Sequence, residues 1–250
     1  MQARMLRMGQ VPRHLEEGVS LAPGMEAILS RWAPRPGDIL TVVDPEGTLY
    51  RARFLGPGQG VRPFTIVPTT LEPRQRRRLA QAIPDRERML WVLQKAVELG
   101  VTDIQPVVSE RSSATSGGPS HHQDKANTWV RVVRKAAIQC RRAILPELLP
   151  PTPLAGMADT LLPNEALLCM DVVGKRQPLF ALAPALVNRP LTLLVGPEGG
   201  WSDQERKYIQ SFGGIVVSVG SRVLRTETAG MAALAVLAAA DGTFTPGEDL

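Results

Sequence analysis

The sequence predicts an α/β fold: a parallel sheet covered by helices over residues 85–250, preceded by a small β-barrel over residues 1–70. In the longer part, short apolar runs typical of buried strands alternate with segments of helical period. In the first 70 residues, β-prone runs are punctuated by frequent proline and glycine, which favours a small barrel over a helical unit. The segment 71–84 is polar, basic and bounded by prolines, so it is predicted to be a linker.

The N-terminal part contains a clear hairpin signal. Ile39–Val43 and Thr48–Phe54 are β-prone and flank the turn sequence 44–47, Asp-Pro-Glu-Gly. Phe64–Val67 offers another strand.

From Asp85 onward, apolar residues recur at the spacing of an α-helix. Asp85 is a candidate N-cap and Gly100 a candidate helix stop. The helix between them places its apolar residues near the helical period: Met89, Val92, Leu93, Ala96 and Val97. Val101–Val108 is predicted to be a strand, and Ser112–Gln123 a loop.

A basic helix is predicted over Asp124–Ala143, with one apolar face. Its cations recur at steps that place them on one face: Arg131, Arg134, Lys135 and Arg142. Such a face can be merely solvated, or it can contact the phosphates of a nucleic acid. Three further apolar runs, Ala166–Met170, Leu191–Val195 and Ile215–Val219, are predicted to be buried strands of the parallel sheet.

Composition excludes several classes of protein. Of the 250 residues, 44% are hydrophobic, which is enough for a packed core. No apolar run approaches the ~18 residues of a membrane span, and the N-terminus lacks the apolar stretch of a secretory signal. Cys140 and Cys169 are predicted to be buried thiols in a reducing, cytoplasmic compartment, and no Cys/His spacing predicts a metal site. The formal charge of +5 suits a polyanionic partner.

The most informative stretch is the glycine-rich loop after Leu191–Val195. Gly196, Gly199 and Gly200 allow unusual backbone angles and close approach of a flat ligand. Ser202 and Glu205 form a capping box that starts the next helix. A phosphate loop is disfavoured, because no Gly-Lys-Ser/Thr follows. The alternative is an ordinary strand–helix turn that happens to be rich in glycine.

A second polar loop follows the last predicted strand and leads to an alanine-rich helix that Thr226 can cap. Arg225 precedes this helix, where a cation is unfavourable to the helix dipole, so a role other than helix stability is indicated. A surface ion pair with Glu227 is the plainer interpretation.

These stretches carry a family resemblance. Leu194–Ser202 (LVGPEGGWS) and Leu224–Ala229 (LRTETA) resemble the two C-terminal signatures of the 16S rRNA uridine N3-methyltransferase family, which belongs to the knotted SPOUT superfamily. Gln94–Val101 (QKAVELGV) and Ala136–Arg142 (AAIQCRR) are similar to its first conserved helix and its basic helix. The similarity extends weakly to Leu29–Arg31 in the N-terminal part.

The resemblance implies a trefoil-knotted C-terminal methyltransferase domain, a PUA-like N-terminal barrel that binds RNA, and a homodimer. It further implies S-adenosyl-L-methionine as the methyl donor, 16S rRNA in the small ribosomal subunit as substrate, and no metal or membrane. The donor would lie against Met170, Val195, Gly196, Pro197, Glu198, Gly199, Gly200, Val219, Gly220, Leu224, Thr226 and Ala229.

For catalysis, uridine N3 must lose a proton, and a guanidinium near O2 and O4 would stabilise the resulting anion. Arg225 is the first candidate and Arg142 the second, while Glu227 could orient an arginine or accept the proton. The RNA-binding candidates are Arg31, Arg131, Arg134, Lys135 and Arg142.

The sequence departs from the family pattern at Ile138, at Cys140 and in the N-terminal part. These departures affect the expected docking of RNA and leave the predicted donor pocket unchanged. The alternatives are a knotted methyltransferase that acts on another RNA and an inactive RNA-binding relative. A Rossmann-type enzyme is disfavoured, because its glycine fingerprint is absent.

Overall fold

The computed structural model describes residues 4–67, 72–112 and 120–242, without the side chains of residues 120–126. The chain forms two compact units. Unit 1 contains residues 1–72 together with 133–145, and unit 2 contains residues 73–132 together with 146–244. The loop predicted over Ser112–Gln123 lies largely outside the described residues, and its last four residues begin a helix.

A mixed sheet forms unit 1, where the sequence predicts a barrel. Its described strands follow the order β1-β2-β3-β4, with β1 parallel to β2 and the other pairs antiparallel. A helix that the sequence pattern did not predict, α1, buries Trp32. The elements are β1 (Leu6–Arg7), α1 (Glu26–Trp32), β2 (Ile39–Val43), β3 (Leu49–Gly56) and β4 (Gly60–Val67).

The predicted hairpin is confirmed. The Asp44 carboxylate accepts hydrogen bonds from the amides of Glu46 and Thr48, both 2.9 Å long, which closes the turn. Val43 then lies opposite Leu49 in the antiparallel register.

Unit 2 contains the predicted parallel sheet. Its described strands follow the order β10-β12-β9-β11-β5-β6-β7, with β8 beside β6, and every pairing is parallel. The strands are β5 (Arg77–Ala82), β6 (Asp103–Val108), β7 (Glu147–Leu148), β8 (Thr152–Pro153), β9 (Ala166–Met170), β10 (Gln177–Pro178), β11 (Leu191–Val195) and β12 (Ile215–Ser218).

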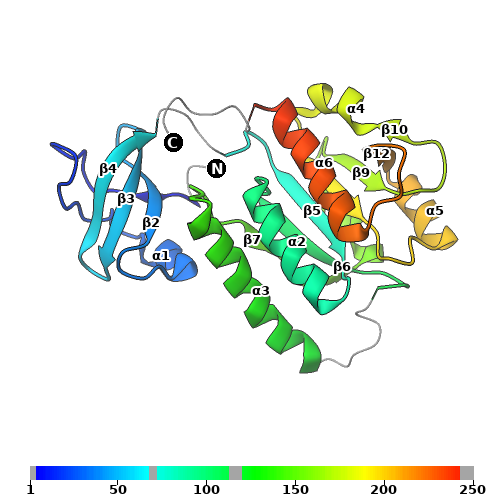
Figure 1. Cartoon of the computed structure of the whole chain (residues 1–250), viewed down its shortest axis with the longest axis horizontal. Helices are drawn as coiled ribbons and strands as arrows, with labels where there is room; N and C mark the ends of the chain where they lie inside the picture. The colour runs from blue at the N-terminus through cyan, green and yellow to red at the C-terminus, as the bar shows by residue number, and fades with distance from the viewer. Residues whose placement is uncertain (1–3, 68–71, 113–119, 243–250) are drawn as a thin grey trace. The chain divides into compact units, whose positions relative to one another are not determined.

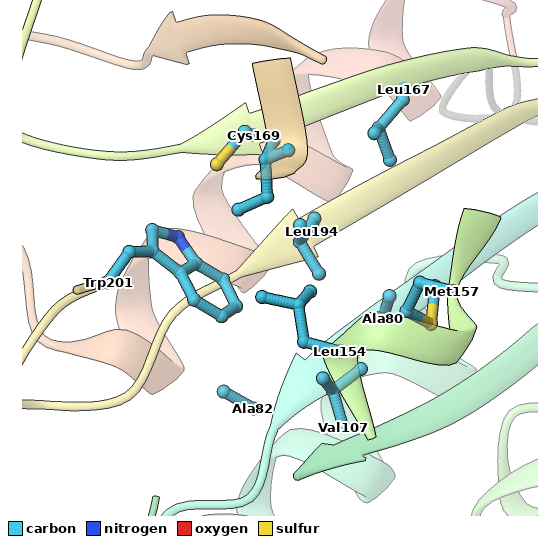
Figure 2. Close-up of a cluster of buried hydrophobic side chains, with 10 residues drawn as sticks. Ala80, Ala82, Val107, Leu154, Met157, Leu167, Cys169, Leu194 and Trp201 are labelled. Carbon is cyan, nitrogen blue, oxygen red and sulfur yellow. The ribbon is translucent and has the colours of Figure 1, made fainter. Parts of the chain in front are cut away.

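Helices cover both faces of this sheet. Alternate side chains of β5 point to opposite faces, so Leu79 and Gln81 approach Gly230 of α6, while Ala80 and Ala82 enter the core cluster around Trp201. On the first face α6 packs against α2 and α4 (Figure 1), and Figure 2 shows the cluster on the second. Among the described residues, the α-helices other than α1 are α2 (Arg86–Glu98), α3 (Ser120–Gln139), α4 (Leu179–Leu186), α5 (Asp203–Ser211) and α6 (Thr226–Ala240).

The helix after Asp85 agrees with its prediction. The Asp85 side chain accepts from the Arg88 amide at 3.0 Å, and Gly100 has a φ of +85° just beyond the C-cap. All five predicted core residues are buried: Met89, Val92, Leu93, Ala96 and Val97. The predicted helix 124–143 also exists, but it begins earlier and ends at Gln139.

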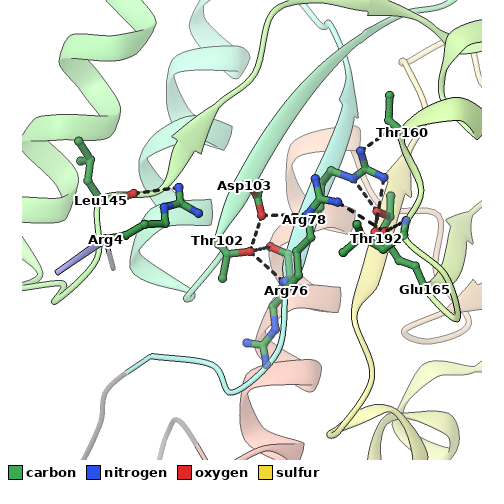
Figure 3. Close-up of polar contacts among 11 residues, drawn as sticks. Arg4, Arg76, Arg78, Thr102, Asp103, Leu145, Thr160, Glu165 and Thr192 are labelled. Atoms are coloured by element: carbon green, nitrogen blue, oxygen red, sulfur yellow. Dashed lines mark hydrogen bonds and ion pairs between the residues drawn. The ribbon is translucent and has the colours of Figure 1, made fainter. Parts of the chain in front are cut away.

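The predicted linker 71–84 is wrong for Arg77–Ala82, which forms the fully buried strand β5 between β11 and β6. Its charges are neutralised internally. The Arg78 guanidinium is buried and binds Thr192 at 2.7 Å and Glu165 at 3.4 Å (Figure 3). Arg77 pairs with Asp241. A basic run therefore need not be solvated when the fold supplies buried carboxylates.

Both cysteines are thiols, but only one is buried. Cys169 lies in the core cluster of unit 2, whereas Cys140 is half-buried after α3. No helix among the described residues is long and apolar enough to cross a membrane.

Candidate functional site

A cavity of about 580 Å³ opens where the carboxyl ends of β9, β11 and β12 meet. This edge of a parallel sheet is where ligands usually bind in α/β proteins. The loops 196–200 and 219–225 form about half of the lining. The remainder comes from strand ends, the segment after β9, the start of α6 and side chains of α2 and α5. Its volume is in the range of small-molecule sites.

The structure brings the predicted donor residues together. Every one of them lines this cavity: Met170, Val195, Gly196, Pro197, Glu198, Gly199, Gly200, Val219, Gly220, Leu224, Thr226 and Ala229. Of the catalytic candidates, Arg225 also lines it, whereas Glu227 and Arg142 do not.

The first loop is shaped by Trp201. The ring is 1% exposed, and a Cβ added to Gly196 would lie 3.0 Å from it, so only glycine fits there without a shift. Gly200 has a φ of +67°, and its amide closes a turn onto the Pro197 carbonyl at 2.9 Å. The predicted capping box of Ser202 is present. Trp201 is therefore a core residue whose ring fixes the shape of the first loop.

The second loop offers its main chain to a ligand. Among the described residues, the backbone groups of 220–224 make no hydrogen bond to another protein group. Apolar side chains border them, including Val219, Leu224 and Ala229. A flat ligand with edge donors and acceptors fits such a lining, because its ring needs apolar contacts and its edges need backbone partners.

Thr226 joins the two loops at the cavity floor. Its hydroxyl donates to the Gly196 carbonyl and accepts from Gln81 Nε2 at 2.9 Å. Gln81 projects from the neighbouring strand β5, so the bridge anchors both loops to the centre of the sheet. Thr226 is not the N-cap as predicted: Arg225 occupies that position, and the hydroxyl is used between the loops instead.

Arg88 of α2 forms a second connection, at the rim. Its Nη1 lies 2.5 Å from Glu198 Oε1 in the first loop, and its Nε lies 3.8 Å from Glu227 Oε1 in the first turn of α6. Asp85 approaches the same guanidinium at 3.2 Å. Glu227 therefore faces Arg88, and the predicted surface pair with Arg225 is not formed.

Comparison with known proteins identifies the family. The model of the RNA methyltransferase domain matches residues 71–238, most of the chain. The chain belongs to the RNA methyltransferase family. The "Ribosomal RNA small subunit methyltransferase E" of Synechocystis sp. is 31% identical over 80% of this chain. The aligned part spans 65% of that relative's own length.

Solved structures of family members agree with the fold. The ribosomal RNA small subunit methyltransferase E of Neisseria gonorrhoeae, bound to S-adenosyl methionine, superimposes with a TM-score of 0.67 at 30% identity. The aligned region covers 94% of this chain and 97% of the Neisseria chain. A putative methyltransferase from Legionella pneumophila, in complex with the cofactor SAM, has a TM-score of 0.63 and 28% identity. The aligned region covers 95% of this chain and 98% of the Legionella chain.

Sequence reasoning missed an ion pair at the cavity wall of this family member. Asp171, directly after β9, binds Arg206 of α5 at 2.9 Å and accepts from the amide of Val172 at 2.7 Å. Both charged residues line the cavity, as do Arg176 and Arg222. A carboxylate just beyond the end of a parallel strand was the available signal.

The remaining predicted residues lie elsewhere. Arg142 belongs to unit 1, is buried, and forms a two-pronged ion pair with Glu72. Arg134 Nε donates to the Arg31 carbonyl at 2.6 Å, so the structure brings these two RNA-binding candidates together. The other two candidates, Arg131 and Lys135, are exposed on α3.

Proposed function

We propose that this chain is an S-adenosyl-L-methionine-dependent methyltransferase that modifies N3 of a uridine in small-subunit ribosomal RNA, in the cytoplasm. The observation that carries the proposal is the cavity at the strand ends, whose lining contains every residue predicted to bind the donor. Relatives named as small-subunit rRNA methyltransferases, one of them bound to S-adenosyl methionine, support the substrate and the donor.

The residues present fit that donor. The free backbone groups of 220–224 are suited to the edge of an adenine, and apolar side chains such as Leu224 and Ala229 are suited to its faces. When bound, S-adenosylmethionine supplies an electrophilic methyl group. The protein's task is then to hold the acceptor base in line with it, an arrangement that can lower a barrier by roughly 7–11 kcal/mol.

Arg225 is the residue to which we assign stabilisation of the uridine anion. It is exposed at the cavity and, within the described part of the chain, forms no ion pair, so its charge is available to a substrate. A fixed guanidinium beside O2 and O4 lowers the cost of losing the N3 proton. Arg142 is not supported as the alternative, because Glu72 already neutralises it in unit 1. Glu227 is assigned to Arg88 rather than to the substrate.

We further propose that the C-terminal domain is trefoil-knotted, as the resemblance implies. The strand order supports this, since β11 lies between β9 and the much earlier β5, and the donor loops follow the central strands. A homodimer is proposed on the same basis. Exposed apolar side chains in unit 2 support it, notably Trp91 at 63% and Val223 at 77% exposure. Light scattering that gives a monomer would contradict the dimer.

RNA binding is proposed for unit 1, with a PUA-like barrel around its mixed sheet, and for the basic side of α3. The pairing of Arg134 with Arg31 supports a shared basic surface in unit 1. Arg131 and Lys135, both exposed, add cations to α3. Contacts of this kind position an RNA without reading its sequence.

The test is methyl transfer from labelled S-adenosylmethionine to small ribosomal subunits that lack native modifications, followed by nucleoside mass spectrometry. The expected product is 3-methyluridine. Arg225→Ala should lower kcat by about 10²–10³-fold, as removal of one anion-stabilising donor does, and leave the Kd for the donor unchanged. Lys207→Ala, which removes an exposed cation outside the cavity, is the matched control.

Other outcomes would revise the proposal. Full methylation by Arg225→Ala would refute its catalytic role. Donor binding without any product would indicate another RNA substrate, and absence of donor binding would indicate an inactive relative.

A further inference from the structure

A small basic cavity in unit 1 is separate from the donor site. Its volume is about 90 Å³, and its lining consists of Arg4, Ile28, Arg31, Trp32 and Leu145. All five residues belong to unit 1, and none of them lines the cavity of unit 2. A water-sized atom needs roughly 10–15 Å³ of such volume, so several ligand atoms fit.

The lining is positively charged. Arg31, in the last turn of α1, is exposed and makes no ion pair within the described part of the chain. Arg4 Nη2 is oriented toward the Leu145 carbonyl at 3.4 Å, which holds a second guanidinium at the cavity. Arg134 adds a third beside it, because its Nε binds the Arg31 carbonyl. Arginines gathered around one small cavity favour an oxyanion, which guanidinium groups bind in a two-pronged geometry.

A buried donor adds an independent observation. Trp32 is 1% exposed and lines this cavity, and its indole Nε1 has no acceptor among the described residues. A buried N–H without a partner costs free energy, so such groups in native proteins call for an explanation. A ligand oxygen that enters from the cavity and displaces the groups covering Nε1 would supply the missing acceptor.

We propose that this cavity binds a phosphodiester group of the RNA backbone, through the guanidiniums of Arg4 and Arg31 and the indole N–H of Trp32. The inference rests on the proposed function for its choice of RNA as the polyanion. Bound in this way, one phosphate fixes the position of unit 1 on the RNA without regard to base sequence. It thereby gives α1, a helix that the sequence pattern did not predict, a defined role in holding the RNA.

The experiment measures RNA affinity of the full chain, independently of catalysis. A short fluorescein-labelled single-stranded oligoribonucleotide is titrated and followed by anisotropy, between about 50 and 200 mM KCl. Arg31→Ala removes a cation of the cavity, and Trp32→Phe removes only the indole donor. Arg53→Ala is the matched control, because Arg53 is an exposed arginine of β3 outside the cavity.

Loss of one phosphate contact should reduce the slope of log K against log salt by about 0.7–1 for Arg31→Ala. Trp32→Phe should weaken binding several-fold at every salt concentration and leave the slope unchanged, since no charge is lost. Arg53→Ala should keep the wild-type slope. Equal slope changes in Arg31→Ala and Arg53→Ala, or wild-type affinity in Trp32→Phe, would overturn the proposal.

Donor binding and methyl transfer separate this inference from the proposed function. Arg31→Ala should bind S-adenosylmethionine with wild-type Kd and show a raised KM for rRNA at unchanged kcat. If the wild-type chain transfers no methyl group but its RNA affinity depends on Arg31 as described, only the proposed function fails. If it methylates rRNA and Arg31→Ala has the wild-type salt slope and KM, only the phosphate site fails.

Discussion

Thr226→Val tests whether the bridge at the cavity floor organises the donor site. Valine has nearly the same shape as threonine but lacks the hydroxyl that joins the Gly196 carbonyl to the Gln81 amide. Thr226 is 6% exposed and Gln81 is fully buried, so water cannot readily replace the lost partner. The substitution therefore leaves a carbonyl of the first donor loop and one amide N–H short of a hydrogen bond.

The expected magnitude follows from the burial of these groups. Loss of a buried partner costs about 1–3 kcal/mol. Gln81 Nε2 retains a second acceptor, the Ala82 carbonyl at 2.9 Å, which favours the lower half of that range. If the released loop must be ordered again when the donor binds, the same free energy appears as a rise in the donor Kd of roughly 5- to 30-fold, at 1.4 kcal/mol per factor of ten.

The assay is calorimetric titration with S-adenosylmethionine, together with thermal unfolding. Thr192→Val is the matched control, because Thr192 lies on β11, the strand that leads into the first loop, at the end remote from the cavity. Its buried hydroxyl accepts from Arg78 Nε at 2.7 Å and donates to Glu165. The control should lose comparable stability and keep the wild-type donor Kd.

Two results would refute the reasoning. A wild-type Kd in Thr226→Val would show that the hydroxyl does not organise the loop for the donor. Equal Kd changes in Thr226→Val and Thr192→Val would show that the effect is general destabilisation. Thr226→Ser, which keeps the hydroxyl, should restore most of the affinity.

Three further outcomes are expected. Arg142→Met leaves the buried Glu72 carboxylate without its cation and should destabilise the protein by about 3–5 kcal/mol in denaturant unfolding, at unchanged donor Kd; a stable but catalytically dead variant would restore the catalytic assignment. Burial raises the pKa of Cys169 to about 12 from an ordinary value of 9.0, so the unfolded thiol ionises first. Stability should therefore fall from pH 9 toward 12 more steeply than in Cys169→Ala, by up to about 1.4 kcal/mol per pH unit, and parallel curves would contradict this. Gly196→Ala places a methyl group against the Trp201 ring and should cost about 1–3 kcal/mol of stability and weaken donor binding; unchanged melting and Kd would show that the ring yields freely.

Local sequence patterns correctly predicted those elements whose start, end and buried face are determined by their own residues. The helix after Asp85 has a cap, an amphipathic period and a glycine stop, and all three act in the structure. The strand 191–195 and the capping box at Ser202 succeed for the same reason. The residues predicted to bind the donor were identified by resemblance, and they line one cavity because parallel strands end at one edge of the sheet.

What failed depended on partners distant in sequence. Arg78 was assigned to a linker because its neighbours in the sequence are polar and basic. Its buried partner, Glu165, lies far along the chain, and no local pattern predicts that pairing. Arg142 looks like one of several surface cations until it is seen to bind Glu72, 70 residues earlier in the chain. In both cases a charged residue was read as solvated or functional, whereas tertiary structure neutralises it in the interior.

The order in which the chain emerges during synthesis has a consequence for these two units. Unit 1 is interrupted in the sequence by sixty residues of unit 2 (73–132). Arg142, the ion-pair partner of Glu72, is therefore synthesised only after that insertion. The central strand β5 must likewise wait for β11, which begins at Leu191. At roughly 5–20 residues per second, the delay before β11 is complete is on the order of 5–20 s. Throughout that interval one edge of β5 lacks its partner strand, and for the first part of it Glu72 also lacks Arg142, so folding on the ribosome should depend on chaperones more than the chain's modest length suggests.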